Sequence, residues 1–124
     1  MVLSRSLLAV MRVAMAVQVI VGIGFWTGHW YGLVNVHMAI GVLYVLAFWV
    51  IAGAAIAQKR ATGLALFAIL WGIVIAAFGM MQQRILPGDL HWIIRVLHLA
   101  IGIAALPIAE RLAASQPRAI AQPA

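Results

Sequence analysis

Two histidines in apolar surroundings are the residues of this 124-residue chain best suited to chemistry. Both stand in the same local pattern, histidine-x-alanine-isoleucine-glycine, so that Gly41 follows His37 and Gly102 follows His98. Residues four apart lie one turn apart on the same face of a helix, which places each imidazole beside a bare patch of backbone. Two such faces turned toward each other predict a flat metal macrocycle held between two nitrogen ligands.

The segments that carry these histidines are apolar enough to cross a membrane. Hydrophobic residues make up 67% of the chain and charged residues 8%, a composition unlike that of soluble domains. A membrane-spanning helix needs about 20 predominantly apolar residues. Four such helices are expected, at Leu7–Trp26, His29–Ala57, Thr62–Met81 and Leu90–Ala113. We therefore predict an all-α fold, a four-transmembrane-helix bundle over residues 1–114, with Asp89 capping the last helix and a flexible tail at 115–124.

Positive charges mark one side of this bundle. The net charge is +6, and six of the eight basic residues lie in three regions that four spans bring to one side: Arg5, Arg12, Lys59, Arg60, Arg111 and Arg118. Only Arg84 and Arg95 lie toward the other side. This positive-inside pattern predicts cytoplasmic termini and a multi-pass protein of the inner (cytoplasmic) membrane. Since the charge sets topology, the lipid bilayer is an expected partner and nucleic acid is not.

The absence of cysteine and the small number of acidic residues argue against several kinds of metal and catalytic site. Without cysteine, the chain cannot form disulfides, iron–sulfur clusters, thiolate zinc sites or covalent haem links. The only acidic residues, Asp89 and Glu110, lie near helix ends. A carboxylate di-iron site, acid–base catalysis and a charged transport path are therefore not indicated. No catalytic residue is predicted.

We predict that His37 and His98 are metal ligands, the axial ligands of one b-type haem, because they are the deeper pair among the four histidines. His91, Arg95 and His98 are spaced to share one helix face. Arg95 is expected to pair with a haem propionate, since a guanidinium pairs well with a carboxylate. His91, Arg84 and His29 are the candidates for the other propionate. His29 and His91, nearer the outer surface, are either solvated or ligands of a second haem.

Small and aromatic residues indicate how the helices pack. Four glycines mark either close helix contacts or room for a cofactor: Gly22, Gly24, Gly72 and Gly79. Five aromatic residues on the histidine side fit an interfacial belt, or contact with a quinone or macrocycle: Phe25, Trp26, Trp30, Tyr31 and Trp92. Trp49 and Trp71 lie deeper or toward the opposite end and are expected to serve packing.

The four-helix plan with His37 and His98 resembles the small membrane cytochromes b, such as cytochrome b561-like electron carriers and the haem-binding anchors of respiratory complexes. The resemblance implies electron transfer at the outer half of the bilayer, with a quinone, another membrane redox subunit or a homo-oligomer. Those cytochromes commonly carry two haems with ligands at both membrane faces. Here no histidine lies in the cytoplasmic half, so one haem is expected.

A second interpretation is a small accessory subunit of a larger respiratory or photosynthetic membrane complex, which binds a pigment or serves structure alone. The separation of the His37 and His98 rings distinguishes the two interpretations, because one iron requires both rings to converge and separate pigments do not. A transporter or channel is less indicated, since no broken helix carries charge at the membrane midplane.

Overall fold

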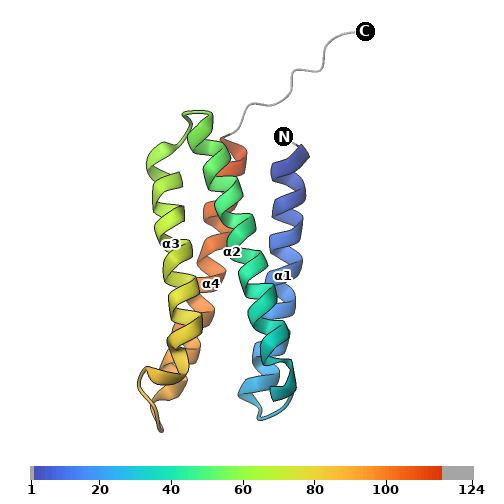
Figure 1. Ribbon diagram of the computed structural model, residues 1–124, viewed down its shortest axis with the longest axis vertical. Helices are drawn as coiled ribbons and strands as arrows, with labels where there is room; N and C mark the ends of the chain where they lie inside the picture. The colour runs from blue at the N-terminus through green and yellow to red at the C-terminus, as the bar shows by residue number, and fades with distance from the viewer. Residues whose placement is uncertain (1, 116–124) are drawn as a thin grey trace.

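The computed structural model describes residues 2–115 and confirms the predicted all-α bundle (Figure 1). It has four long helices: α1 (Val2–Trp26), α2 (Val34–Ala57), α3 (Thr62–Met81) and α4 (His91–Ala114). Two short 3-10 helices, η1 (Tyr31–Leu33) and η2 (Gln82–Arg84), precede α2 and follow α3. All four long helices are long and apolar enough to cross a membrane. No strand occurs in residues 2–115.

The four helices follow one another around the bundle, and α2 and α4 also contact each other across its diagonal. The basic end carries the start of α1, the loop between α2 and α3 with Lys59 and Arg60, and the end of α4 (Figure 1). The histidine end carries the loops that follow α1 and α3. Because α2 and α4 both start at the histidine end, they run in the same direction and hold His37 and His98 in the same half, as expected.

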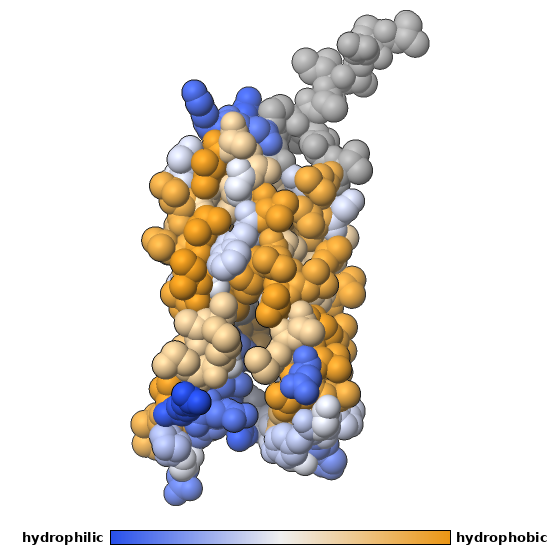
Figure 2. All heavy atoms as spheres, in the orientation of Figure 1, coloured by the Kyte–Doolittle hydropathy of each residue, from blue (hydrophilic) through white to orange (hydrophobic). Residues whose placement is uncertain are grey.

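The surface of the bundle fits a lipid bilayer. Figure 2 shows hydrophobic side chains along the middle of the visible face and hydrophilic residues gathered at both ends. Four exposed aromatic residues lie at the histidine end, where an interfacial belt is expected: Trp26, Trp30, Tyr31 and Trp92. The chain is therefore a multi-pass membrane protein.

Three helix starts differ from the prediction, those of α1, α2 and α4. The first helix begins earlier than expected, at Val2. The last helix begins at His91, and Leu90 occupies its N-cap without a side-chain hydrogen bond, so the Asp89 cap was a wrong prediction. The turn closes through the backbone instead, because the amide of His91 donates to the carbonyl of Gly88 at 3.0 Å.

The loop between α1 and α2 excludes His29 from the second helix. Gly28 and Trp30 both have positive φ angles, 82° and 61°, which a right-handed helix does not contain. The Trp30 ring lies close over Gly24, and a Cβ added at Gly24 would collide with the ring. His29 is consequently exposed, with its Nδ1 3.3 Å from the hydroxyl oxygen of Thr27.

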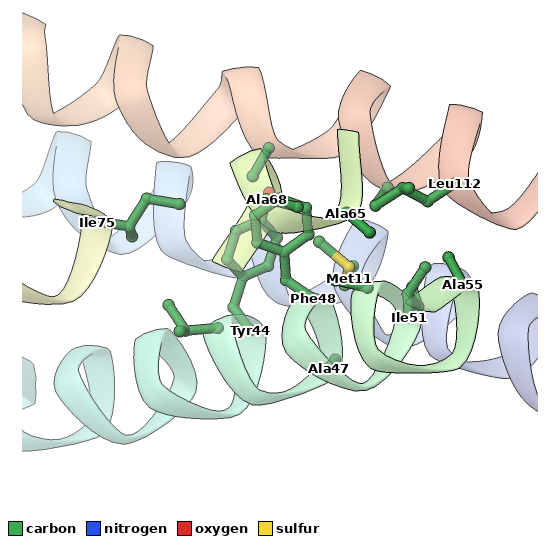
Figure 3. Packing of buried hydrophobic residues seen from close by; sticks show 14 of the residues in the cluster. Met11, Tyr44, Ala47, Phe48, Ile51, Ala55, Ala65, Ala68, Ile75 and Leu112 are labelled. Atoms are coloured by element: carbon green, nitrogen blue, oxygen red, sulfur yellow. The ribbon is translucent and has the colours of Figure 1, made fainter. Parts of the chain in front are cut away.

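The buried core lies toward the basic end (Figure 3). The largest fully buried side chains are Phe48, Met11, Ile51 and Leu112. Alanines of α2, α3 and α4 surround them: Ala52, Ala55, Ala65, Ala68, Ala105 and Ala109. Small side chains let helix backbones approach closely, which matters in lipid because van der Waals packing replaces the hydrophobic effect as the main attraction between helices.

Side-chain hydrogen bonds join the helices near the middle of the bundle. They run from Trp49 Nε1 to the Ile69 carbonyl (3.1 Å), from Trp71 Nε1 to the Ile101 carbonyl (3.0 Å) and from the Tyr44 hydroxyl to the Gly102 carbonyl (2.9 Å). Pro107 lies inside α4 and has no N–H, so the carbonyl four residues before it lacks its usual helical donor. The accepting carbonyls of Ile101 and Gly102 lie just before that carbonyl. Both tryptophans thus serve helix packing, as expected.

An ion pair joins α1 to α4 in the half toward the basic end. Nη2 of Arg12 lies 2.6 Å from Oε1 of Glu110, and both side chains are about half exposed. Of the predicted tail at 115–124, only Ser115 lies within the described residues, and its hydroxyl donates to the Leu112 carbonyl at 2.7 Å. Positions 116–124 lie outside them.

Candidate functional site

The imidazoles of His37 and His98 face each other across the interior of the bundle. Their ring centroids are 6.4 Å apart, and the ring planes are tilted by 46°. His37 comes from α2 and His98 from α4, the two helices in contact across the diagonal. Both side chains are partly buried. The structure thus brings together the two residues that the sequence singled out as a ligand pair.

His37 packs against two residues of α1. Its Cε1 lies 3.9 Å from the point where a Cβ on Gly22 would stand, an ordinary van der Waals distance. The ring of Phe25 meets the imidazole edge to face, with the centroids 5.2 Å apart. Phe25 therefore belongs to the wall around His37 as well as to the aromatic group at the histidine end.

His98 makes comparable contacts with α3. Its Cε1 lies 3.2 Å from the Cβ position of Gly79, which leaves almost no room for a larger residue. The Phe78 ring is nearly parallel to the imidazole, with the centroids 6.2 Å apart. Each histidine is thus accompanied by a glycine and a phenylalanine of the preceding helix. The hairpins α1–α2 and α3–α4 present their imidazoles in a similar way.

Side chains of α1 cover the glycines that follow the histidines by one turn. The amide nitrogen of Gln18 lies 2.8 Å from the Cβ position of Gly41, and the methyl carbon of Met15 lies 3.5 Å from that of Gly102. The patches expected to be bare are therefore filled. The glycines that adjoin the imidazoles belong to the neighbouring helices α1 and α3 instead, and sequence spacing alone did not assign them to the histidines.

Buried polar atoms without a hydrogen-bond partner gather in this half of the bundle. In residues 2–115 they are Nδ1 of His37, Nδ1 of His98, Oε1 of Gln18 and Oε1 of Gln82. Leaving such an atom unpaired costs about 1–3 kcal/mol, and folded proteins contain few of them. Neither glutamine was singled out from the sequence. Two of the four atoms belong to the facing imidazoles of His37 and His98.

The other candidates lie nearer the histidine end. His91, Arg95 and His98 are all partly buried on α4, whereas the intervening Trp92 is exposed, so the three share an inward face as predicted. Nδ1 of His91 lies 3.3 Å from the carbonyl oxygen of Ile85. Within the described part of the chain, Arg95 has no carboxylate within ion-pair distance.

The donor set suits a metal that brings ligands of its own. No three histidine, cysteine or acidic side chains gather in residues 2–115, whereas sites in which protein alone binds zinc use three or four ligands. A haem brings four macrocycle nitrogens and asks the protein only for axial ligands. The paired imidazoles of His37 and His98 fit that requirement.

Comparison of the chain with protein-family models, with curated proteins and with solved structures gives no match.

Proposed function

We propose that the protein is a membrane b-type cytochrome that binds one haem between His37 and His98 and relays single electrons. The observation that carries the proposal is the 6.4 Å separation of the two ring centroids. A metal bound by two opposing imidazole nitrogens at about 2 Å each holds those nitrogens about 4 Å apart. The remainder of the separation corresponds to the inner halves of the two rings. One iron fits this spacing, whereas two separately bound pigments require no convergence.

The packing of the two halves supports the same proposal. The largest fully buried side chains, Phe48, Met11, Ile51 and Leu112, all lie toward the basic end. At the histidine end, Figure 2 shows a recess between the two sides of the bundle. Ligand sites in helix bundles are commonly built between facing helices. We therefore place the bound group in the half with the histidines.

The surrounding residues have separate roles in this proposal. His37 and His98 hold the iron, and the phenylalanines that contact the imidazoles limit ring movement and the access of water. Arg95, on the same face as His98, pairs with a propionate, and His91 is the candidate for the second. The haem supplies reversible one-electron chemistry. The positive charge of Arg95 favours the less positive, reduced iron and so raises the reduction potential.

The charge asymmetry supports a position in the outer half of the bilayer. Lys59, Arg60 and Arg111 gather at the basic end, which the positive-inside rule assigns to the cytoplasm of a bacterial-type inner membrane. The resemblance to small membrane cytochromes b suits such a carrier. All four histidines of the sequence belong to the other half, so electrons are exchanged there, with a quinone or a partner redox subunit.

Reduced-minus-oxidised absorption spectra of the purified protein supplied with haem test the proposal. We expect a b-type α-band in the wild type and its loss in both His37→Ala and His98→Ala. His29→Ala is the control, because it removes an exposed histidine at the end of the bundle, and it is expected to keep the band. A wild-type protein without the band overturns the proposal and leaves the accessory subunit as the better interpretation.

A further inference from the structure

We infer that Gln18 accepts a hydrogen bond from the Nδ1–H of His37 and thereby holds that ring with Nε2 free for the ligand. The inference rests on the proposed function, because a proton on Nδ1 is what a metal-binding Nε2 requires. Gln18 is a positioning residue in this account. It lies on α1, and the bond would join α1 to α2 inside the membrane.

The two helices bring Gln18 and His37 together through a reciprocal contact. On α1, Gln18 and Gly22 are one turn apart, and on the antiparallel α2, His37 and Gly41 are one turn apart. The His37 ring lies over Gly22, and the Gln18 amide lies over Gly41. Each long polar side chain thus occupies the space left by a glycine of the other helix. The two side chains are neighbours along the same helix interface, separated by about 6 Å of axial rise.

The unpartnered atoms of the two side chains are chemically complementary. Nδ1 of His37 and Oε1 of Gln18 are both buried without a hydrogen-bond partner. An amide oxygen only accepts hydrogen bonds, and a neutral imidazole that offers Nε2 as a ligand donates through Nδ1. The inferred bond requires the Gln18 amide to turn from Gly41 toward the ring about its side-chain torsions, because no hydrogen bond joins the two side chains in the structure. One hydrogen bond then satisfies both atoms.

Such a bond is the usual support of a metal-binding histidine. The ring nitrogen that does not bind the metal almost always donates to an oxygen, which fixes the tautomer and the orientation of the ring. The corresponding position beside the other ligand differs, because Met15 covers Gly102 and offers no oxygen. Met15 is therefore a matched control: it lies on the same helix, three residues away, and covers the equivalent glycine.

The tautomer of His37 in the haem-free protein is the first readout. Nitrogen-15 NMR of the neutral imidazole distinguishes a proton on Nδ1 from one on Nε2. We expect the proton on Nδ1 in the wild type and a shift of population toward Nε2 in Gln18→Met, while Met15→Leu leaves the tautomer unchanged. The inference is overturned if the wild-type ring carries its proton on Nε2, or if Gln18→Met leaves the tautomer population unchanged.

Haem titration is the second readout. Loss of a supporting hydrogen bond of this kind typically weakens metal binding about 10–100-fold, and we expect Gln18→Met to weaken haem binding by this factor. Gln18→Glu keeps an acceptor oxygen and is expected to restore most of the affinity. Unchanged affinity in Gln18→Met counts against the positioning role. A wild-type protein that binds no haem overturns the proposed function alone, because the NMR readout needs no haem.

Discussion

The two ends of the bundle differ in how completely their side chains are satisfied. Toward the basic end, Phe48 and Leu112 are fully buried among alanines, and near the middle the hydroxyl and indole donors reach backbone carbonyls. Toward the histidine end, buried apolar side chains are fewer, Val21 and Ile94 among them. In residues 2–115, all the buried side-chain nitrogen and oxygen atoms without a hydrogen-bond partner belong to that half.

This contrast separates the part of the chain that holds the fold from the part that we propose binds the haem. Both halves place an aromatic ring over a glycine of α3. At Gly72 the ring is the indole of Trp49, whose N–H is bonded. At Gly79 it is the imidazole of His98, whose Nδ1 is not. Since unsatisfied buried groups cost stability, their concentration at one end supports a functional reason for it.

Removing a fully buried ring from the basic end is expected to have the largest effect on stability. Phe48→Ala leaves a cavity among the core alanines and should lower the free energy of unfolding by about 3 kcal/mol. Unfolding in detergent mixtures, followed by helical circular dichroism, measures the loss. Val50→Ala, at an exposed position of the same helix, is the control and should change little. Equal losses at both positions would contradict the assigned core.

Crowding the contact between α2 and α3 is expected to have the next largest effect. In Gly72→Ala the new Cβ collides with Trp49, so the indole must move and its bond to the Ile69 carbonyl breaks. We expect a loss of about 2 kcal/mol, measured by the same unfolding assay. Gly63→Ala is the control, because nothing lies within 4 Å of that Cβ position, and it should be neutral.

The same substitution at Gly79 sharpens the comparison between the two halves. There the imidazole of His98 must move by a few tenths of an ångström. We expect a smaller loss of stability than at Gly72, accompanied by weaker haem binding. If Gly79→Ala leaves haem binding unchanged and Gly72→Ala impairs it, the division of roles between the two ends is wrong.

At the histidine end, an apolar substitution is expected to raise stability when haem is absent. His98→Leu removes a buried Nδ1 that has no partner, and it should stabilise the haem-free protein by about 1 kcal/mol. The same unfolding assay measures the gain. Tyr44→Phe is the control, and it should lower the stability of the protein. It removes a hydroxyl that donates a hydrogen bond to the Gly102 carbonyl. Destabilisation by His98→Leu would show that this imidazole serves the fold.

The helices were predictable and their exact starts were less so. Long apolar runs in lipid form helices because every backbone polar group must be paired within the segment, and breaks at 27–28, 58–60 and 87–89 separate them as expected. His29 and Asp89 were misassigned. The left-handed Trp30 and the backbone turn at Gly88 decided those boundaries, and neither changes the hydropathy pattern.

The candidate site was predictable only within single helices. The shared face of His91, Arg95 and His98 follows from their spacing on one helix. Gly22 and Gly79 were recognisable as small contact residues, but not as the neighbours of the two imidazoles. No fixed spacing relates residues on different helices, because each helix can rotate and slide against its partner until the summed packing is best.

The amino-acid sequence alone therefore established four membrane helices and the residues that share a face on each helix, because these follow from hydropathy and from the 3.6-residue turn. The assembled bundle established which atoms meet. It set the two imidazoles 6.4 Å apart, placed Gln18 over Gly41 and left Nδ1 of His37 unpaired. Those contacts depend on the rotation and depth of whole helices, which many weak interactions settle together.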